Sequence, residues 1–164
     1  MYKPIFIAGP CVIETFDILE EVAKELVRLN NKYGINIIFK SSFDKANRTS
    51  LHSYRGPNLE KGLTMLNDIK MKYGLSLLTD IHEPYQAEIV GGIVDVIQIP
   101  AFLCRQTDLL VAAARTGKII NIKKAQFLSG QDMKYPVEKV RETGNANVWL
   151  TERGNTFGYK QSGC

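Results

Sequence analysis

Short apolar runs alternate along this chain with longer stretches in which apolar residues return every three or four positions. The short runs are rich in β-branched side chains, as buried strands are; they cover residues 5–8, 35–39, 75–79, 94–99, 119–122 and 147–150. The longer stretches have the period of an amphipathic helix; they cover residues 16–33, 59–73, 84–91, 107–116 and 132–144. The pattern therefore predicts six strands that alternate with helices.

Glycine recurs where the helical periodicity ends, at Gly34, Gly74, Gly117 and Gly144. A left-handed cap at the C-terminus of a helix favours glycine. Strand, helix and glycine repeated in this order predict a parallel sheet, either closed into a (β/α)₈ barrel or open and doubly wound. The phosphate-binding patterns GxGxxG and GxxxxGK[ST] are absent from the sequence, which weakens the open, nucleotide-binding alternative.

Polar and charged residues concentrate where the predicted strands end. The fullest group lies in residues 39–50, which contain Lys40, Lys45 and Arg48 among serine, asparagine and threonine. Lysine supplies a compact charge and arginine a forked donor, so the segment suits a small phosphorylated or carboxylated substrate. Barrel enzymes place their chemistry at this end of every strand, whereas an open sheet confines it to one switch point. We therefore predict an α/β fold of the (β/α)₈ TIM-barrel type, truncated to about six βα units.

Composition and charge argue against several classes of function but do not identify one. The chain has 164 residues, 45% of them hydrophobic, and a net charge of +4 that is spread along its length. This distribution gives no support to nucleic-acid binding. The apolar run near the N-terminus is too short for a signal peptide or a membrane span, so we expect a cytoplasmic protein. Three cysteines without a CxxC pair make a disulfide framework or a structural zinc module unexpected.

Six motifs, in order over residues 1–159, resemble those of 3-deoxy-D-manno-octulosonate 8-phosphate synthase, also named 2-dehydro-3-deoxyphosphooctonate aldolase. They are GPCVIE at 9–14, the segment 39–50, TDIHE at 79–83, QIPAFLCRQTD at 98–108, NIKKAQF at 121–127 and LTERGNTFGY at 150–159. The sibling family, 3-deoxy-D-arabino-heptulosonate 7-phosphate synthase, shares the Gly-Pro-Cys opening. It typically has Lys-Pro-Arg-Thr where this chain has Lys-Ala-Asn-Arg-Thr at 45–49, so Asn47 favours the octulosonate enzyme.

The resemblance implies condensation of phosphoenolpyruvate with D-arabinose 5-phosphate and water, with release of inorganic phosphate. Residues at the matching positions would bind phosphoenolpyruvate: Lys40, Ser42, Arg105, Lys123 and Arg153. Another set would bind arabinose 5-phosphate: Lys45, Asn47, Arg48 and Thr49. Lys45 and Asn47 would be catalytic, with Lys45 taking part in proton transfer or electrostatic stabilisation. Lys124 falls on the opposite strand face from Lys123, and we expect it to be structural.

The resemblance also implies a metal and an assembly. Metal-dependent members carry a cysteine at the position of Cys11, where metal-independent members carry asparagine. A thiolate suits a divalent transition metal such as iron, zinc or manganese. The family further implies a homotetramer, a role in lipopolysaccharide biosynthesis, and no nucleic-acid or membrane partner.

The sequence departs from the family at its end. Six strand-like runs are present, whereas a closed barrel has eight and about 250 residues. The family's other metal ligands, a histidine, a glutamate and an aspartate, belong to the seventh and eighth strands and the loop beyond. We therefore expect a partial barrel over residues 1–159, a divergent tail at 160–164, no retained metal and no detectable synthase turnover. A fragment that keeps weak phosphate or phosphoenolpyruvate binding is the alternative to an active enzyme, and a broken gene and a genuinely short product both remain open.

Overall fold

The computed structural model describes residues 4–155, in which six strands alternate with five α-helices. The strands are β1 (Ile5–Ala8), β2 (Asn36–Lys40), β3 (Leu77–Asp80), β4 (Val96–Ile99), β5 (Ile119–Lys123) and β6 (Val148–Thr151). The helices are α1 (Phe16–Tyr33), α2 (Leu59–Tyr73), α3 (Gln86–Gly91), α4 (Thr107–Arg115) and α5 (Lys134–Glu142). Short 3₁₀ turns cover Ala101–Leu103 and Gln131–Met133. The expected order of elements is confirmed, with boundaries that move by up to about two residues.

Local sequence explains where the two longest helices begin and end. Thr15 Oγ1 accepts from the Ile18 amide at the start of α1, and Asn58 Oδ1 accepts from the Lys61 amide at the start of α2. Gly34 ends α1 with a φ of 58° and Gly74 ends α2 with a φ of 64°, a left-handed conformation that a side chain would disfavour.

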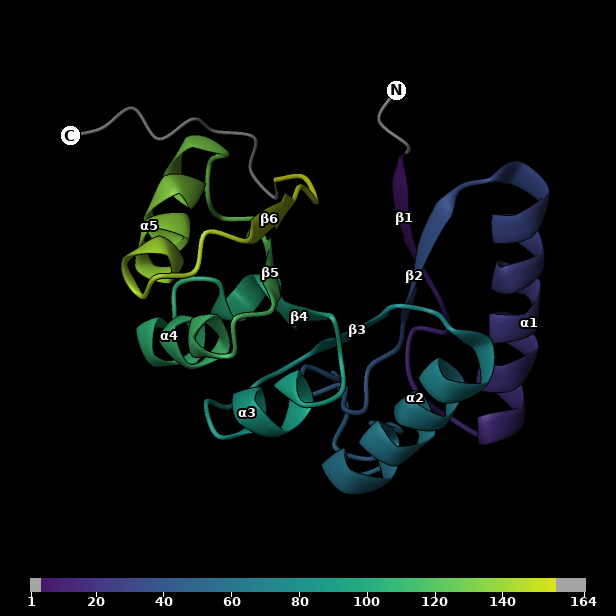
Figure 1. The fold of residues 1–164 in the computed structure, drawn as a ribbon. Coiled ribbons are helices and arrows are strands. Elements are labelled where there is room, and N and C mark those ends of the chain that lie inside the picture. The colour runs from purple at the N-terminus through teal and green to yellow at the C-terminus, as the bar shows by residue number, and fades with distance from the viewer. Residues whose placement is uncertain (1–3, 156–164) are drawn as a thin grey trace. The chain divides into compact units, whose positions relative to one another are not determined.

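The described residues form two compact units: residues 4–80 with 93–95, and residues 81–92 with 96–155. In the first unit β2 pairs in parallel with β1 and with β3. Helices α1 and α2 pack against each other on the same side of β1 and β2 (Figure 1). Buried apolar residues fill this unit, among them Leu19, Phe39, Phe43, Leu66 and Leu77. Ile5, Phe6 and Ile7 of β1 are 41–49% exposed, whereas the apolar residues of β2 are buried.

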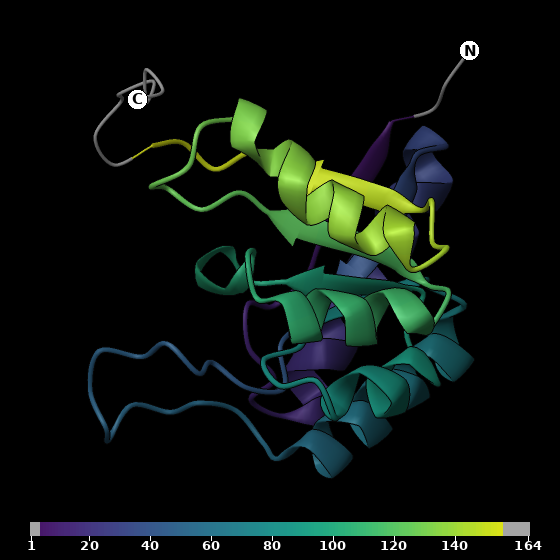
Figure 2. The same cartoon turned by 90° about the vertical axis from the view of Figure 1, so that its left-hand side faces the viewer.

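In the second unit β5 pairs in parallel with β4 and with β6. Helix α4 packs between α3 and α5, and the three helices cover one face of these strands (Figure 2). Ile97, Ile99, Leu110, Ile120 and Ile122 are fully buried in this unit. Both units thus consist of parallel strands in sequence order with helical crossovers, which confirms the fold as part of a (β/α) barrel.

No helix within residues 4–155 is long and apolar enough to cross a membrane. The predicted divergent tail at 160–164 lies outside the described residues.

Candidate functional site

Ser42, two residues beyond the end of β2, is the centre of a polar cluster in the first unit. Its fully buried hydroxyl oxygen accepts hydrogen bonds from Lys40 Nζ at 3.0 Å and from Lys45 Nζ at 2.8 Å. The same hydroxyl donates to Asp80 Oδ1 at the end of β3. Two ammonium groups are therefore held on one oxygen, and a carboxylate sets the direction of the hydroxyl proton.

The pKa values of this cluster reflect its crowding. Burial lowers the pKa of Lys40 to about 8, while the negative charge of Asp80 acts in the opposite direction. The pKa of the Cys11 thiol is lowered overall. Partial burial acts to raise this pKa, but a hydrogen bond from Lys45 and the positive charges of Lys45, Lys40 and Arg48 have the larger combined effect. The positive charges of the cluster thus favour a negatively charged group next to them.

The segment that carries the arabinose 5-phosphate candidates follows this cluster. Asn47, Arg48 and Thr49 are exposed, whereas Lys45 is half-buried. Arg48 Nε donates to the Tyr54 carbonyl at 3.1 Å, and the Tyr54 hydroxyl donates to the Ile13 carbonyl at 2.9 Å. Arg48 is therefore anchored through Nε, and this bond does not use the N–H donors of its two terminal nitrogens.

A glycine brings the Cys11 segment close to β2. A Cβ at Gly9 would lie 2.1 Å from the Lys40 carbonyl oxygen, a distance that no side chain can occupy. Lys40 Nζ in turn donates to the Cys11 carbonyl at 3.3 Å. The close approach of two backbones thus explains the glycine of the Gly-Pro-Cys motif.

Polar side chains also line up across the strands of the second unit. Asn121 Nδ2 donates to Gln98 Oε1 at 3.4 Å, and Thr151 Oγ1 donates to Asn121 Oδ1 at 2.7 Å. The three residues belong to β4, β5 and β6, and Gln98 and Asn121 are buried. This row holds the Asn121 amide in place, two residues before Lys123 at the end of β5.

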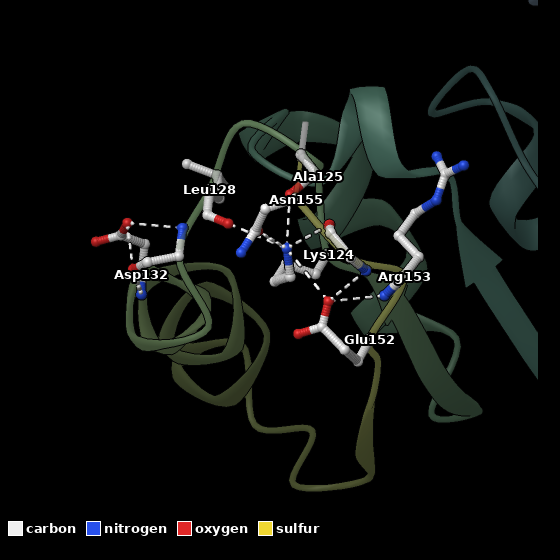
Figure 3. A network of polar contacts seen from close by, with 9 residues as sticks. Lys124, Ala125, Leu128, Asp132, Glu152, Arg153 and Asn155 are labelled. Carbon is white, nitrogen blue, oxygen red and sulfur yellow. Dashed lines mark hydrogen bonds and ion pairs between the residues drawn. The ribbon is translucent and has the colours of Figure 1, made fainter. Parts of the chain in front are cut away.

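The phosphoenolpyruvate candidates of the second unit lie on its strand ends and loops. Lys123 is half-buried at the end of β5, Arg105 is exposed after β4, and Arg153 is exposed after β6. The Arg105 carbonyl accepts from Lys139 Nζ at 3.0 Å. Lys124, by contrast, is 2% exposed and bonded to several oxygens (Figure 3).

The structure brings some of the predicted residues together and adds others. Lys40, Ser42 and Lys45 share one hydrogen-bonded cluster, and Cys11 lies within reach of Lys45. Asp80 was absent from the residues proposed from sequence, although its place at a strand end was the available signal. No such signal singled out Tyr54, because its role depends on a contact 41 residues away. The roles assigned to all these residues stay predictions.

The described residues do not fit the metal that the family resemblance implies. Within residues 4–155 no three His, Cys, Asp or Glu side chains come together as a possible metal site. The Cys11 thiol instead faces lysine and arginine cations, which oppose a divalent ion. We therefore derive no chemical step through a metal.

Comparisons with known proteins agree with the motifs. A sequence profile of the DAHP synthetase I family matches residues 2–163. The 2-dehydro-3-deoxyphosphooctonate aldolase of Fusobacterium nucleatum is 55% identical over 155 residues, which make up 94% of this chain and 56% of that protein. The enzyme of the same name from Helicobacter pylori is 52% identical over 170 residues, with 96% of this chain and 62% of that protein covered.

A third relative of this name, from Brucella ovis, is 57% identical over 153 residues, which are 93% of this chain and 55% of that protein. The chain thus spans 55–62% of the length of these curated relatives. All three carry the octulosonate name, so the similarity favours that enzyme over the heptulosonate sibling and confirms the resemblance seen in the motifs. The chain belongs to the DAHP synthetase I family.

Proposed function

We propose that the chain carries substrate-binding residues of an enzyme that condenses phosphoenolpyruvate with D-arabinose 5-phosphate and water to give 3-deoxy-D-manno-octulosonate 8-phosphate and inorganic phosphate, and that residues 1–164 alone bind these substrates without turnover. C3 of phosphoenolpyruvate forms a bond to the aldehyde carbon of the sugar, whose oxygen takes up a proton. Water adds at C2 and loses a proton, and the bond from C2 to the phosphate oxygen then breaks. The relatives named above support the reaction, and the cationic cluster of the first unit is the structural observation that carries it.

The first unit supplies groups suited to bind and orient anionic substrates. The Lys40 and Lys45 ammonium groups converge on Ser42 and form a fixed patch of positive charge. Such a preorganised patch stabilises the negative charge of a carboxylate or phosphate without further reorganisation. We assign Lys40 and Ser42 to phosphoenolpyruvate. Lys45 is the candidate for electrostatic stabilisation of the developing alkoxide at the aldehyde.

Exposed polar residues beyond Lys45 suit the sugar phosphate. We assign Asn47, Arg48 and Thr49 to arabinose 5-phosphate, with Asn47 orienting the aldehyde beside Lys45. The anchoring of Arg48 Nε on the Tyr54 carbonyl supports this assignment, because it holds the guanidinium in place before the ligand arrives.

In the second unit Arg105, Lys123 and Arg153 are the proposed anion-binding residues. They stand at the ends of strands or in the loops that follow, where barrel enzymes bind their substrates. A cytoplasmic location, a homotetramer and a place in lipopolysaccharide biosynthesis also belong to this proposal and rest on the family resemblance alone.

The decisive test measures binding and turnover separately. Calorimetric titration of purified 1–164 with phosphoenolpyruvate should show saturable binding. Lys45→Met should weaken binding of arabinose 5-phosphate roughly tenfold, as expected for the loss of one charge-assisted contact. Lys61→Met is the matched control, because Lys61 is an exposed lysine of α2. Absence of binding of both substrates by the unsubstituted chain would contradict the proposal.

Phosphate release is then followed with phosphoenolpyruvate, added divalent metal, and either arabinose 5-phosphate or erythrose 4-phosphate. We expect binding without release, because the described residues hold the cations but no metal donor set. Release that requires arabinose 5-phosphate would establish the synthase reaction and show that residues 1–164 suffice for it. Release that requires erythrose 4-phosphate would favour the heptulosonate sibling instead.

A further inference from the structure

Lys124 carries a positive charge inside the second unit, where an ammonium group is costly to bury without partners. Its Nζ lies 2.6–3.3 Å from five oxygens: Asn155 Oδ1, Gly154 O, Leu128 O, Ala125 O and Glu152 Oε1 (Figure 3). Four of these five groups are neutral, and one is a carboxylate. We call this arrangement the Lys124 cage.

The Lys124 cage joins two loops that are far apart in the sequence. Ala125 and Leu128 belong to the loop after β5, and residues 152–155 follow β6. Lys124 also donates its backbone amide to the Thr151 carbonyl at 2.9 Å. One side chain therefore fixes the start of the β6 loop against the end of β5.

The Lys124 cage also helps to hold the Glu152 carboxylate in one position. Glu152 Oε1 accepts from the Gly154 amide at 2.7 Å and from the Arg153 amide at 2.8 Å, and it pairs with Lys124 at 3.3 Å. These contacts, the Gly154 amide first, together lower the pKa of Glu152 although burial acts in the opposite direction. The carboxylate is thus held ionised on its own backbone and on Lys124.

Arg153 is the residue that this arrangement leaves available. Its side chain extends away from the Glu152 carboxylate (Figure 3), and within residues 4–155 its guanidinium makes no ion pair. A carboxylate one residue away competes with an anionic ligand for an arginine, since the two groups can form charge-assisted hydrogen bonds. Holding Glu152 elsewhere therefore keeps Arg153 open to an anionic ligand.

We propose that Lys124 is a positioning residue for anion binding: it orders the loop that carries Arg153 and keeps the Glu152 carboxylate off the Arg153 guanidinium. The proposal rests on the function proposed above, in which Arg153 binds phosphoenolpyruvate. It extends the expectation that Lys124 is structural, because it gives this buried lysine an effect on ligand affinity.

The test compares Lys124→Met with Asn145→Ala in the full 1–164 chain. Asn145 is a buried side chain of the same unit whose Nδ2 donates to the Ala114 and Lys118 carbonyls, so its loss destabilises the unit at a different place. Affinity for phosphoenolpyruvate is measured by calorimetry and stability by urea unfolding. We expect Lys124→Met to weaken binding about tenfold and Asn145→Ala to leave it within about twofold.

A second substitution separates positioning from general destabilisation. In the Lys124→Met background, Glu152→Gln removes the competing charge while its amide oxygen still accepts backbone hydrogen bonds. The double variant should therefore regain part of the lost affinity without regaining stability. A double variant that binds no better than Lys124→Met, or an equal loss of affinity in Asn145→Ala, would overturn the proposal. Asn155→Ala is the milder variant, with a smaller loss in the same direction, should Lys124→Met fail to fold.

A readout without ligand keeps this proposal distinct from the proposed function. Hydrogen exchange of the Gly154 amide should be faster in Lys124→Met than in the unsubstituted chain and in Asn145→Ala, because the cage holds its acceptor. Unchanged exchange would overturn the inference whatever the binding data show. Faster exchange together with no phosphoenolpyruvate binding by the unsubstituted chain would instead support the ordering of the loop and contradict the proposed function.

Discussion

Ser41 and Ser42 are neighbours that are both fully buried, yet their hydroxyl groups have different surroundings. The Ser42 hydroxyl contacts Lys40, Lys45 and Asp80. The Ser41 hydroxyl has no hydrogen-bond partner among residues 4–155. Alternation along an extended chain explains the difference, because residues 40 and 42 project to the same side and residue 41 to the other.

At this scale we predict that Ser42→Ala lowers the free energy of unfolding by about 1–3 kcal/mol, because it removes a buried group that three polar side chains share. Ser41→Ala should change it by less than about 0.5 kcal/mol, since no hydrogen bond within the described residues is lost. Urea unfolding of both variants measures the difference. An equal loss of unfolding free energy in the two variants would show that the hydrogen bonds of Ser42 make no net contribution to stability.

Among the elements, α1 and α2 are joined by a cluster that their separate sequences do not reveal. The Glu20 carboxylate of α1 accepts hydrogen bonds from Lys72 and from the Tyr73 hydroxyl of α2, and from Lys24 of its own helix at 3.2 Å. These contacts, that of Lys72 first, lower the pKa of Glu20 to about 2. The helices themselves could be predicted from periodicity and caps, but this pairing depends on how they pack.

We predict that this carboxylate makes stability depend on pH. Its pKa in the folded chain is about 2 and its ordinary value is 4.5, so its contribution is complete above pH 4.5 and disappears as the pH falls towards 2. The difference in unfolding free energy between the unsubstituted chain and Glu20→Gln should therefore be largest near pH 6 and vanish near pH 2.

Glu25→Gln is the matched control on the same helix, because Glu25 pairs with Arg28 three residues away. Such a pair within one exposed helix contributes little, so the control should show the smaller difference at pH 6. If the difference in unfolding free energy between the unsubstituted chain and Glu20→Gln grows as the pH falls, the predicted pH dependence is wrong.

For the whole molecule, the division into two units does not follow the chain strictly. Residues 93–95 belong to the first unit although the residues on both sides belong to the second. Lys70 Nζ donates to the Ile93 carbonyl at 2.9 Å and to Asp95 at 2.9 Å, and Asp95 Oδ2 accepts from the Leu77 amide at 2.8 Å. A short polar cluster thus ties this segment to α2 and β3.

We predict that Asp95→Ala destabilises the first unit by about 1–3 kcal/mol, because the Leu77 amide and the Lys70 ammonium both lose an acceptor. Hydrogen exchange should locate the loss at the amides of β3. Asn145→Ala is the counterpart in the second unit and should increase exchange at the Asn147 amide, whose acceptor is Asn145 Oδ1 at 2.9 Å. Increased exchange of Asn147 in Asp95→Ala without an increase in β3 would argue against this assignment.

The sequence by itself determined the six strands, the helices between them, the glycine ends of α1 and α2, and the placement of cations where strands finish. These features depend on periodicity and on contacts between close neighbours in the chain, which a sequence displays directly. It also identified the family, because the motifs that carry the resemblance are contiguous.

Only the tertiary structure decided which polar groups meet. Ser42 reaches Asp80 across 38 residues, and Lys124 reaches Asn155 across 31. Asp80 was therefore missing from the predicted site, and Lys124 was expected to be structural without an indication of its partners. Contacts of this kind depend on strand register and on the path of the loops beyond the strand ends, and both are set by packing over the whole unit, which local pattern does not encode.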